Sequence, residues 1–132
     1  MPEMTTQELA TYLIACLEGC RLTAFQDPGG VWSIGFSHTG PAVVEGLVWN
    51  YVQAVTQLQD DIAPLLLLVV SLPVPHGAAL VSFGYNCGRG ALELVLAGHD
   101  TIGNPRHYTD RHGNVLTALQ SRRRLEEALM LL

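Results

Sequence analysis

The sequence contains no lysine and few charges of either sign. Its seven cationic side chains are all arginines, against twelve aspartates and glutamates, which gives a formal net charge of -5. Non-specific nucleic-acid binding depends on a net basic face. We therefore expect no nucleic-acid partner.

Long apolar runs are also missing. The most apolar run, Leu65 to Val70, follows Pro64 and is six residues long, against the roughly 20 that a helix needs to cross a bilayer. We predict a buried core helix here and no stable membrane insertion.

The N-terminus, Met1-Pro2-Glu3, lacks the basic stretch and apolar core of a secretory signal peptide. This predicts a cytoplasmic protein without a signal peptide.

Cysteine is scarce, with Cys16, Cys20 and Cys87 alone. The number is odd and the spacing matches neither a zinc site nor a redox pair, so we predict three buried thiols. The histidines likewise have no metal-binding spacing, and no metal is expected. We interpret the last three of them as surface loop residues: His99, His107 and His112.

With 132 residues, the chain fits one domain, residues 1–132, large enough to bury a hydrophobic core. Its first half predicts a helix and then a β-hairpin. Thr5-Thr6-Gln7-Glu8 has the form of a capping box, apolar residues recur at helical spacing up to Glu18, and Gly19 is a natural stop. Two β-prone runs, 22–25 and 31–36, then flank a turn at 26–30.

The second half predicts helices joined by breaks at proline and glycine. Asn50 can cap a helix that reaches Ile62. Further helical or short apolar segments are predicted at 64–72, 77–86, 91–97 and 115–131, with a surface loop or short helix at 98–114. The predicted class is α+β and mostly α, with a small N-terminal hairpin and a helical C-terminal part.

Glu18, at a helix end, and Asp27, at the start of a turn, could supply the two carboxyl groups that glycoside hydrolysis needs. One carboxylic acid protonates the leaving oxygen, and one carboxylate activates water or stabilises the developing cation. Acidic residues at such positions are ordinarily solvated, so the pair alone is a weak signal.

Three segments together carry a family resemblance. Residues 18–39, from Glu18 to Thr39, closely resemble the active-site signature of phage-type lysozymes, glycoside hydrolase family 24, in which Glu, Asp and Thr follow at a spacing met here by Glu18, Asp27 and Ser33. Residues 79–91 look like the family's core helix and the turn after it, and Arg122-Arg123-Arg124 with Glu127 looks like its C-terminal arginine helix. The resemblance implies a lysozyme-like, two-lobe single domain.

The resemblance implies a role for each catalytic position. Glu18 would be the general acid, Asp27 would handle the water or the cationic transition state, and the hydroxyl of Ser33 would hold that water. Ser33 departs from the family's usual threonine. Serine lacks the methyl group that stiffens the side chain, so we expect slower catalysis, not inactivity.

The same alignment implies substrate and supporting residues. Thr39 and Tyr85 would line the sugar-binding cleft, although ordinary helix packing remains an alternative for Tyr85, and Asn86 would lie near Glu18. Arg123 would pair with Glu18 and orient it, whereas arginine triplets on terminal helices usually form a solvated face. For His38 we predict a structural role, in which its side chain braces the hairpin.

By resemblance, the implied function is hydrolysis of the β-1,4 bond between N-acetylmuramic acid and N-acetylglucosamine in bacterial peptidoglycan, as a muramidase that lyses the host cell. No cofactor is expected, and the protein would be a monomer. It would stay in the host cytoplasm until a holin or another membrane lesion released it to the wall. Two alternatives remain: a catalytically weak or inactive peptidoglycan-binding module, and a structural helical protein on an inherited scaffold.

Overall fold

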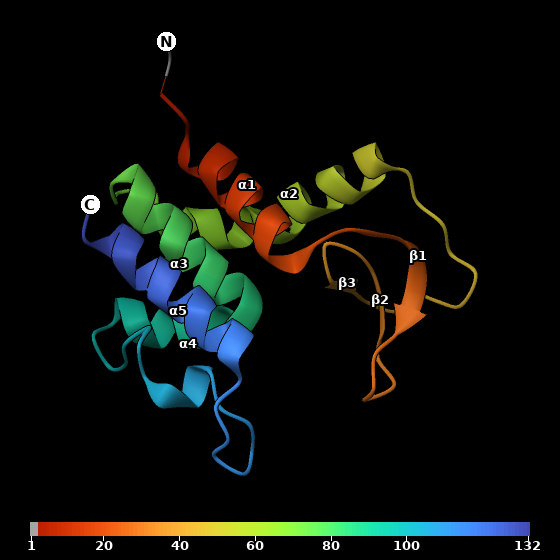
Figure 1. Ribbon diagram of the computed structural model, residues 1–132. Helices are drawn as coiled ribbons and strands as arrows, with labels where there is room; N and C mark the ends of the chain where they lie inside the picture. Colours follow the sequence, from red (N-terminus) through yellow and green to blue (C-terminus); the bar gives the residue numbers. More distant parts are fainter. Residues whose placement is uncertain (1–2) are drawn as a thin grey trace. The chain divides into compact units, whose positions relative to one another are not determined.

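The protein is described here by a computed structural model over residues 3–132, and Met1 and Pro2, on which part of the signal-peptide prediction rests, lie outside the described residues. The class is α+β and mostly α, as predicted (Figure 1). Two compact units are present: one is Thr11–Pro64, and the other is Leu65–Leu132 together with the described residues up to Ala10. The elements in chain order are α1 (Thr6–Glu18), β1 (Arg21–Gln26), β2 (Trp32–Gly35), β3 (His38–Thr39), α2 (Tyr51–Leu67), α3 (Val74–Cys87), α4 (Arg89–Leu96), the 3-10 helix η1 (Pro105–His107) and α5 (Thr117–Met130).

Helix α1 has the bounds that the sequence predicts. At its start the backbone N–H of Glu8 donates to Oγ1 of Thr5 over 3.1 Å, which satisfies one of the free donors of the first turn. At its end Gly19 adopts φ +70° and donates its N–H to the carbonyl of Ala15 over 3.1 Å. Glycine takes this left-handed conformation without steric cost. The chain therefore turns out of the helix directly after Glu18.

The predicted hairpin is part of a three-stranded antiparallel sheet with the order β1-β2-β3. Ser33 in the central strand pairs with Phe25 of β1 and with Thr39 of β3. The strand β3 was not expected from the sequence, because only two residues form it after a reversal at Gly35 (φ +67°) and Ser37 (φ +65°). That reversal also ends β2 one residue earlier than predicted.

Helix α2 begins at the predicted cap but ends later than expected. The N–H of Gln53 donates to Oδ1 of Asn50, and the N–H of Asn50 donates to Oε1 of Gln53, both over 2.8 Å, which is a complete capping box. The helix then continues through Pro64 to Leu67. The predicted start of a new segment at Pro64 is wrong. The proline costs the helix one hydrogen bond and crowds the preceding turn, but the residues after it keep their N–H groups and can still donate.

The prediction of a buried helix over 65–70 is wrong in part, because α2 ends at Leu67 and only two of the six residues are buried. Leu65 and Val69 are buried, but Leu67 and Val70 are 75% and 77% exposed. Because a helix distributes consecutive residues around its axis, the apolar run directs Leu67 outward. Val70 lies in the turn that follows the helix. In the part of the chain that the structure describes, no helix is long and apolar enough to span a membrane.

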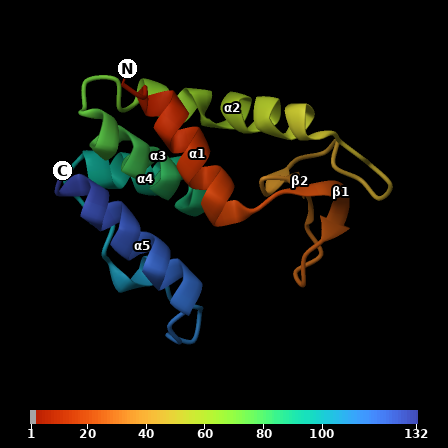
Figure 2. The ribbon, with the colours of Figure 1, turned by 45° about the horizontal axis from the view of Figure 1, so that its top comes forward.

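Helix α3 is the centre of the second unit, where it packs against both α4 and α5 (Figures 1 and 2). The two prolines that the sequence suggested as breaks instead begin this helix: Pro73 is its N-cap and Pro75 lies in its first turn. Eight consecutive residues, 77–84, are buried. A Cβ on Gly84 would approach Cδ2 of Leu92 to 2.9 Å, so the glycine allows α4 to pack closely.

The prediction that all three cysteines are buried is wrong. Cys16 and Cys20 are exposed, Cys87 is half-buried, and all three are free thiols. On α1 the fully buried positions are Ala10 and Ile14, so Cys16 lies away from the packed stripe. The general tendency of cysteine towards burial was therefore a poor guide at these positions.

Candidate functional site

The two predicted catalytic carboxylates belong to the same unit, Thr11–Pro64, and lie just before and just after strand β1. Glu18 is the last residue of α1, is partly exposed, and its side chain has interactions of its own. Asp27 is partly exposed in the turn that follows β1. A rigid helix end and a tight turn thus position the pair.

Asp27 is fixed by the turn that it begins. Its backbone N–H donates to the carbonyl of Val31, and its Oδ1 accepts from the N–H of Val31, both over 2.9 Å. Gln26 closes the turn by donating from Nε2 to the carbonyl of Gly30 over 2.9 Å. Among residues 3–132, no group donates to Oδ2 of Asp27. That oxygen can accept a hydrogen bond from water or from a substrate.

Ser33 and Thr39 face each other across β2 and β3. Ser33 is 7% exposed, and its hydroxyl makes no hydrogen bond within the described part of the chain. Thr39 is exposed. These positions are compatible with the predicted roles of holding water and lining a cleft, which remain predictions.

His38 links the sheet to helix α2. Its Nδ1 lies 2.7 Å from Oδ2 of Asp61, whose Oδ1 accepts from Nε2 of Gln57 over 2.9 Å. The ring of His38 also packs on that of Trp49, with centroids 5.7 Å apart. These contacts are of the kind that a bracing role requires.

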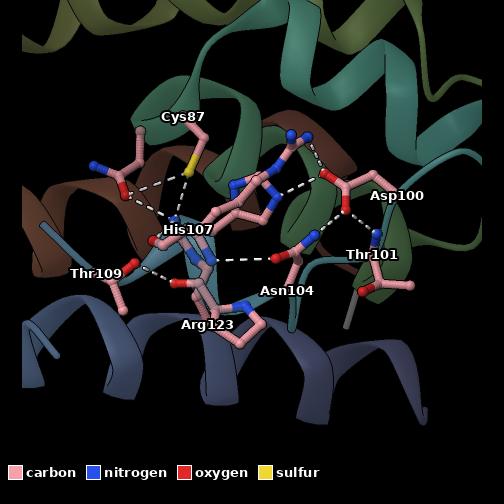
Figure 3. Close-up of polar contacts among 10 residues, drawn as sticks. Cys87, Asp100, Thr101, Asn104, His107, Thr109 and Arg123 are labelled. Atoms are coloured by element: carbon pink, nitrogen blue, oxygen red, sulfur yellow. Dashed lines mark hydrogen bonds and ion pairs between the residues drawn. The ribbon is translucent and has the colours of Figure 1, made fainter. Parts of the chain in front are cut away.

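The predicted residues Tyr85, Asn86 and Arg123 belong to the other unit. Tyr85 is partly exposed and has interactions of its own, and Asn86 is exposed. Arg123 is fully buried, and its Nη1 donates to Oδ1 of Asn86 over 2.9 Å and contacts Sγ of Cys87 at 2.7 Å (Figure 3). Pairing of Arg123 with Glu18 would join the two units and stays a prediction.

The arginine helix is not a solvated face, because Arg122 and Arg123 are 5% and 0% exposed. The carboxylate that holds them is Glu126, which was not singled out from the sequence. Its oxygens accept from Nε and Nη2 of Arg123 over 2.6 and 3.0 Å and from the hydroxyl of Ser82 over 2.6 Å. Burial raises the pKa of Glu126, and the nearby charge of Arg123 and the hydrogen bond from Ser82 offset this only in part.

The loop after α4 contains a second polar cluster (Figure 3). Asp100 accepts from Nδ2 of Asn104 over 2.9 Å, lies 2.8 Å from Nε2 of His107, and pairs with Arg106. His107 packs edge-on against Phe83, with ring centroids 4.8 Å apart, and its side chain is 7% exposed. The interpretation of His107 as a surface residue is therefore wrong, whereas His99 and His112 are exposed as predicted.

Several residues that support the site were not found from the sequence. Asp61, Glu126 and Asp100 have no distinctive motif around them, although Glu126 follows Arg123 by three positions, a spacing at which helical side chains meet. That spacing could have indicated it. Across residues 3–132 no three histidine, cysteine, aspartate or glutamate side chains form a group suited to a metal ion.

A family model and two curated relatives match this chain in sequence. A family model described as phage lysozyme matches residues 15–126. Two curated relatives, the endolysins of Lactococcus phage c2 and Lactococcus phage phivML3, are each 39% identical over 84 residues. Each match covers 58% of this chain and 36% of the relative, so the match spans only about a third of those proteins.

Solved structures match over nearly the whole chain. The muramidase domain of SpmX from Asticaccaulis excentricus is 29% identical, with a TM-score of 0.78 over 98% of this chain and 99% of that one. The endolysin from Escherichia coli O157:H7 phage FAHEc1 is 24% identical, with a TM-score of 0.76, and the match covers 98% of this chain and 95% of that one. These likenesses confirm the predicted lysozyme-like fold class.

Proposed function

Because the chain belongs to the phage lysozyme family, a family of glycoside hydrolases, we propose that it cleaves the β-1,4 bond between N-acetylmuramic acid and N-acetylglucosamine in bacterial peptidoglycan. The observation that carries this proposal is the placing of Glu18 and Asp27 in one unit, at the end of α1 and in the turn after β1. This reaction needs two carboxyl groups on either side of the bond that breaks, and here one would come from a helix end and the other from a closed turn.

In the proposed reaction, the protonated carboxyl of Glu18 gives its proton to the glycosidic oxygen as the bond to the anomeric carbon breaks. Asp27 accepts a proton from the water that attacks that carbon, so a new hemiacetal end and a free hydroxyl form. Oδ1 of Asp27 is held by Val31, which leaves Oδ2 to orient the water. Attack on the face opposite the leaving group would invert the anomeric carbon.

Ser33 supports the same water in this proposal. Its hydroxyl belongs to the central strand and is nearly buried, so the strand fixes the position of Cβ. Thr39, on the neighbouring strand, would contact the sugar, with Tyr85 and Asn86 completing the binding residues and Arg123 orienting Glu18. His38 and Asp61 would brace the sheet on which Ser33 and Thr39 lie.

The proposed partner is the peptidoglycan of the host, and the protein would act as a monomer that lyses the cell from within. It would reach the wall from the host cytoplasm through a holin or another membrane lesion. The family membership of the chain supports a wall substrate.

The test is product analysis on purified peptidoglycan. After digestion, borohydride reduction converts each new reducing end to its alditol, which mass spectrometry identifies. We expect reduced N-acetylmuramic acid as the new end. Reduced N-acetylglucosamine would contradict the bond assignment, and binding to the glycan without any new reducing ends would favour the wall-binding module.

A further inference from the structure

A shallow hollow lies on the first turns of helix α2, within the unit Thr11–Pro64. Its volume is about 280 Å³, and its lining consists of Trp49, Val52, Gln53, Thr56 and Gln57. None of these residues has a part in the proposed reaction. Small-molecule sites begin at roughly 300 Å³, so the hollow suits one sugar ring better than a larger ligand.

Trp49 forms a fixed aromatic wall of this hollow. Its backbone N–H donates to the carbonyl of Leu22 over 2.8 Å. Its ring lies against Gly35, where a Cβ would approach ring carbon Cζ3 to 3.0 Å, and against the ring of His38. The ring is nevertheless partly exposed. An immobile, partly exposed indole offers an apolar face on which a sugar can stack.

The two glutamines of the hollow are oriented by their neighbours in opposite senses. Oε1 of Gln53 accepts from the backbone N–H of Asn50 over 2.8 Å, so its amide nitrogen remains a donor. Nε2 of Gln57 donates to Oδ1 of Asp61 over 2.9 Å, so its oxygen remains an acceptor. Neither amide can be reversed, because an N–H needs an acceptor and a carboxylate needs a donor. The hollow thus presents one free donor and one free acceptor, one helical turn apart.

A secondary acetamide group has the complementary chemistry. Its carbonyl accepts one hydrogen bond, its N–H donates another, and its methyl group is apolar. We propose that this hollow is an accessory site for an N-acetylated amino sugar: the carbonyl accepts from Nε2 of Gln53, the N–H donates to Oε1 of Gln57, and the methyl group and ring face lie on Trp49 and Val52. That this sugar belongs to peptidoglycan rests on the proposed function.

The site is tested by NMR titration of the intact protein with N-acetylglucosamine. The two tryptophans, Trp32 and Trp49, give two indole N–H signals, and Trp49→Phe assigns them. We expect the Trp49 indole signal and the side-chain amide signals of Gln53 and Gln57 to shift with a common dissociation constant. Glucosamine and glucose, which lack the acetamide, should leave them unmoved. Equal shifts with glucosamine would overturn the proposal.

The variant Gln53→Glu removes the proposed contact with the sugar without removing the cap that stabilises helix α2. A glutamate keeps the oxygen that accepts from Asn50 in the capping box but replaces the outward amide nitrogen with an oxygen. We expect about tenfold weaker binding of N-acetylglucosamine, the loss typical of one unmade hydrogen bond to a polar group. Gln59→Glu, an exposed position on the same helix outside the hollow, makes the same change of charge and should bind like the parent. Unchanged binding in Gln53→Glu would overturn the proposal.

A monosaccharide has no glycosidic bond to cleave, so this titration is independent of the hydrolytic reaction. Wall hydrolysis without any shift at Trp49 would refute the accessory site alone. Shifts at Trp49 without wall hydrolysis would refute the proposed reaction and leave the accessory site standing.

Discussion

Among the residues proposed for catalysis, Asp27 and Ser33 differ in how firmly their oxygens are held. Asp27 has one oxygen tied to the backbone of Val31 across a closed turn. The hydroxyl of Ser33 makes no hydrogen bond within residues 3–132, and a serine rotates about χ1 more freely than a β-branched threonine. If both hold the same water, Ser33 is the looser of the two.

A threonine at position 33 should therefore improve catalysis. We expect Ser33→Thr to raise kcat several-fold on purified peptidoglycan with little change in KM, because the added methyl group restricts the hydroxyl to fewer rotamers. Ser33→Ala, which removes the hydroxyl, is the control and should lower kcat. An unchanged kcat in Ser33→Thr would show that the serine has no cost.

The thiols should separate into two reactivity classes. Cys16 and Cys20 are exposed, whereas Cys87 is half-buried. Burial raises the pKa of the thiols of both Cys20 and Cys87, so access of the reagent is what separates Cys87 from the other two. A thiol-reactive chromophore should therefore label Cys16 and Cys20 quickly in the native protein and Cys87 slowly. Cys87→Ser should remove the slow phase. Three equal rates would contradict this assignment.

At the level of secondary-structure elements, the starts of α1 and α2 were predictable because their signals are local, whereas α3 begins at Val74 and not at the predicted residue 77. Thr5 and Asn50 cap α1 and α2 through side chains within three residues of their partners. Strand β3 and the continuation of α2 through Pro64 could not be predicted in this way. The two-residue strand β3 is defined by pairing with Ser33 and Ile34, which is a tertiary contact that no local pattern encodes.

The cap of α2 should be worth a measurable amount of stability. Replacing an N-cap asparagine by alanine costs about 1 kcal/mol, so Asn50→Ala, which removes the acceptor for the N–H of Gln53, should lower the free energy of unfolding in urea by about that amount. Asn50→Asp keeps an acceptor for the N–H of Gln53 and should remain within a few tenths of the parent. A loss as large in Asn50→Asp would show that the capping bond is not the cause.

On the scale of the whole molecule, the sequence indicated the family-specific site but not the polar networks around it. The carboxylates Glu18 and Asp27 could be proposed as catalytic from the sequence because a short segment resembles the family signature, and this role stays a prediction. The half-buried pair of His38 with Asp61 and the buried hydrogen bond from Ser82 to Glu126 join residues far apart in the sequence through the fold. Their partners could be named only after the helices and strands were placed.

Stability should fall in acid through Asp100. Its pKa lies well below the ordinary value because of the hydrogen bonds from Asn104, Thr101, His107 and Arg106, with that of Asn104 the largest cause. A carboxyl with a lowered folded pKa stabilises the protein above its unfolded pKa of about 4 and loses that contribution as the pH falls further.

The difference in unfolding free energy between the parent and Asp100→Asn should therefore be fully present at about pH 5 and shrink below about pH 4. Urea unfolding across this range measures it, with Asp60→Asn, an exposed carboxylate on α2, as the control. A difference that grows in acid would contradict the assignment.

Net charge should make wall hydrolysis depend on salt. The chain carries a formal charge of -5, and an anionic wall would repel it at long range when screening is weak. We expect hydrolysis to rise from the lowest salt concentration to a moderate one. A steady decline from the lowest salt would contradict this.

The most direct test of the account is reducing-end release from purified peptidoglycan by the parent chain and by Glu18→Gln, with folding matched by circular dichroism. The account predicts release by the parent and its loss in Glu18→Gln, because the amide has no acidic proton to give to the leaving oxygen. Release that survives in a folded Glu18→Gln variant would contradict the account.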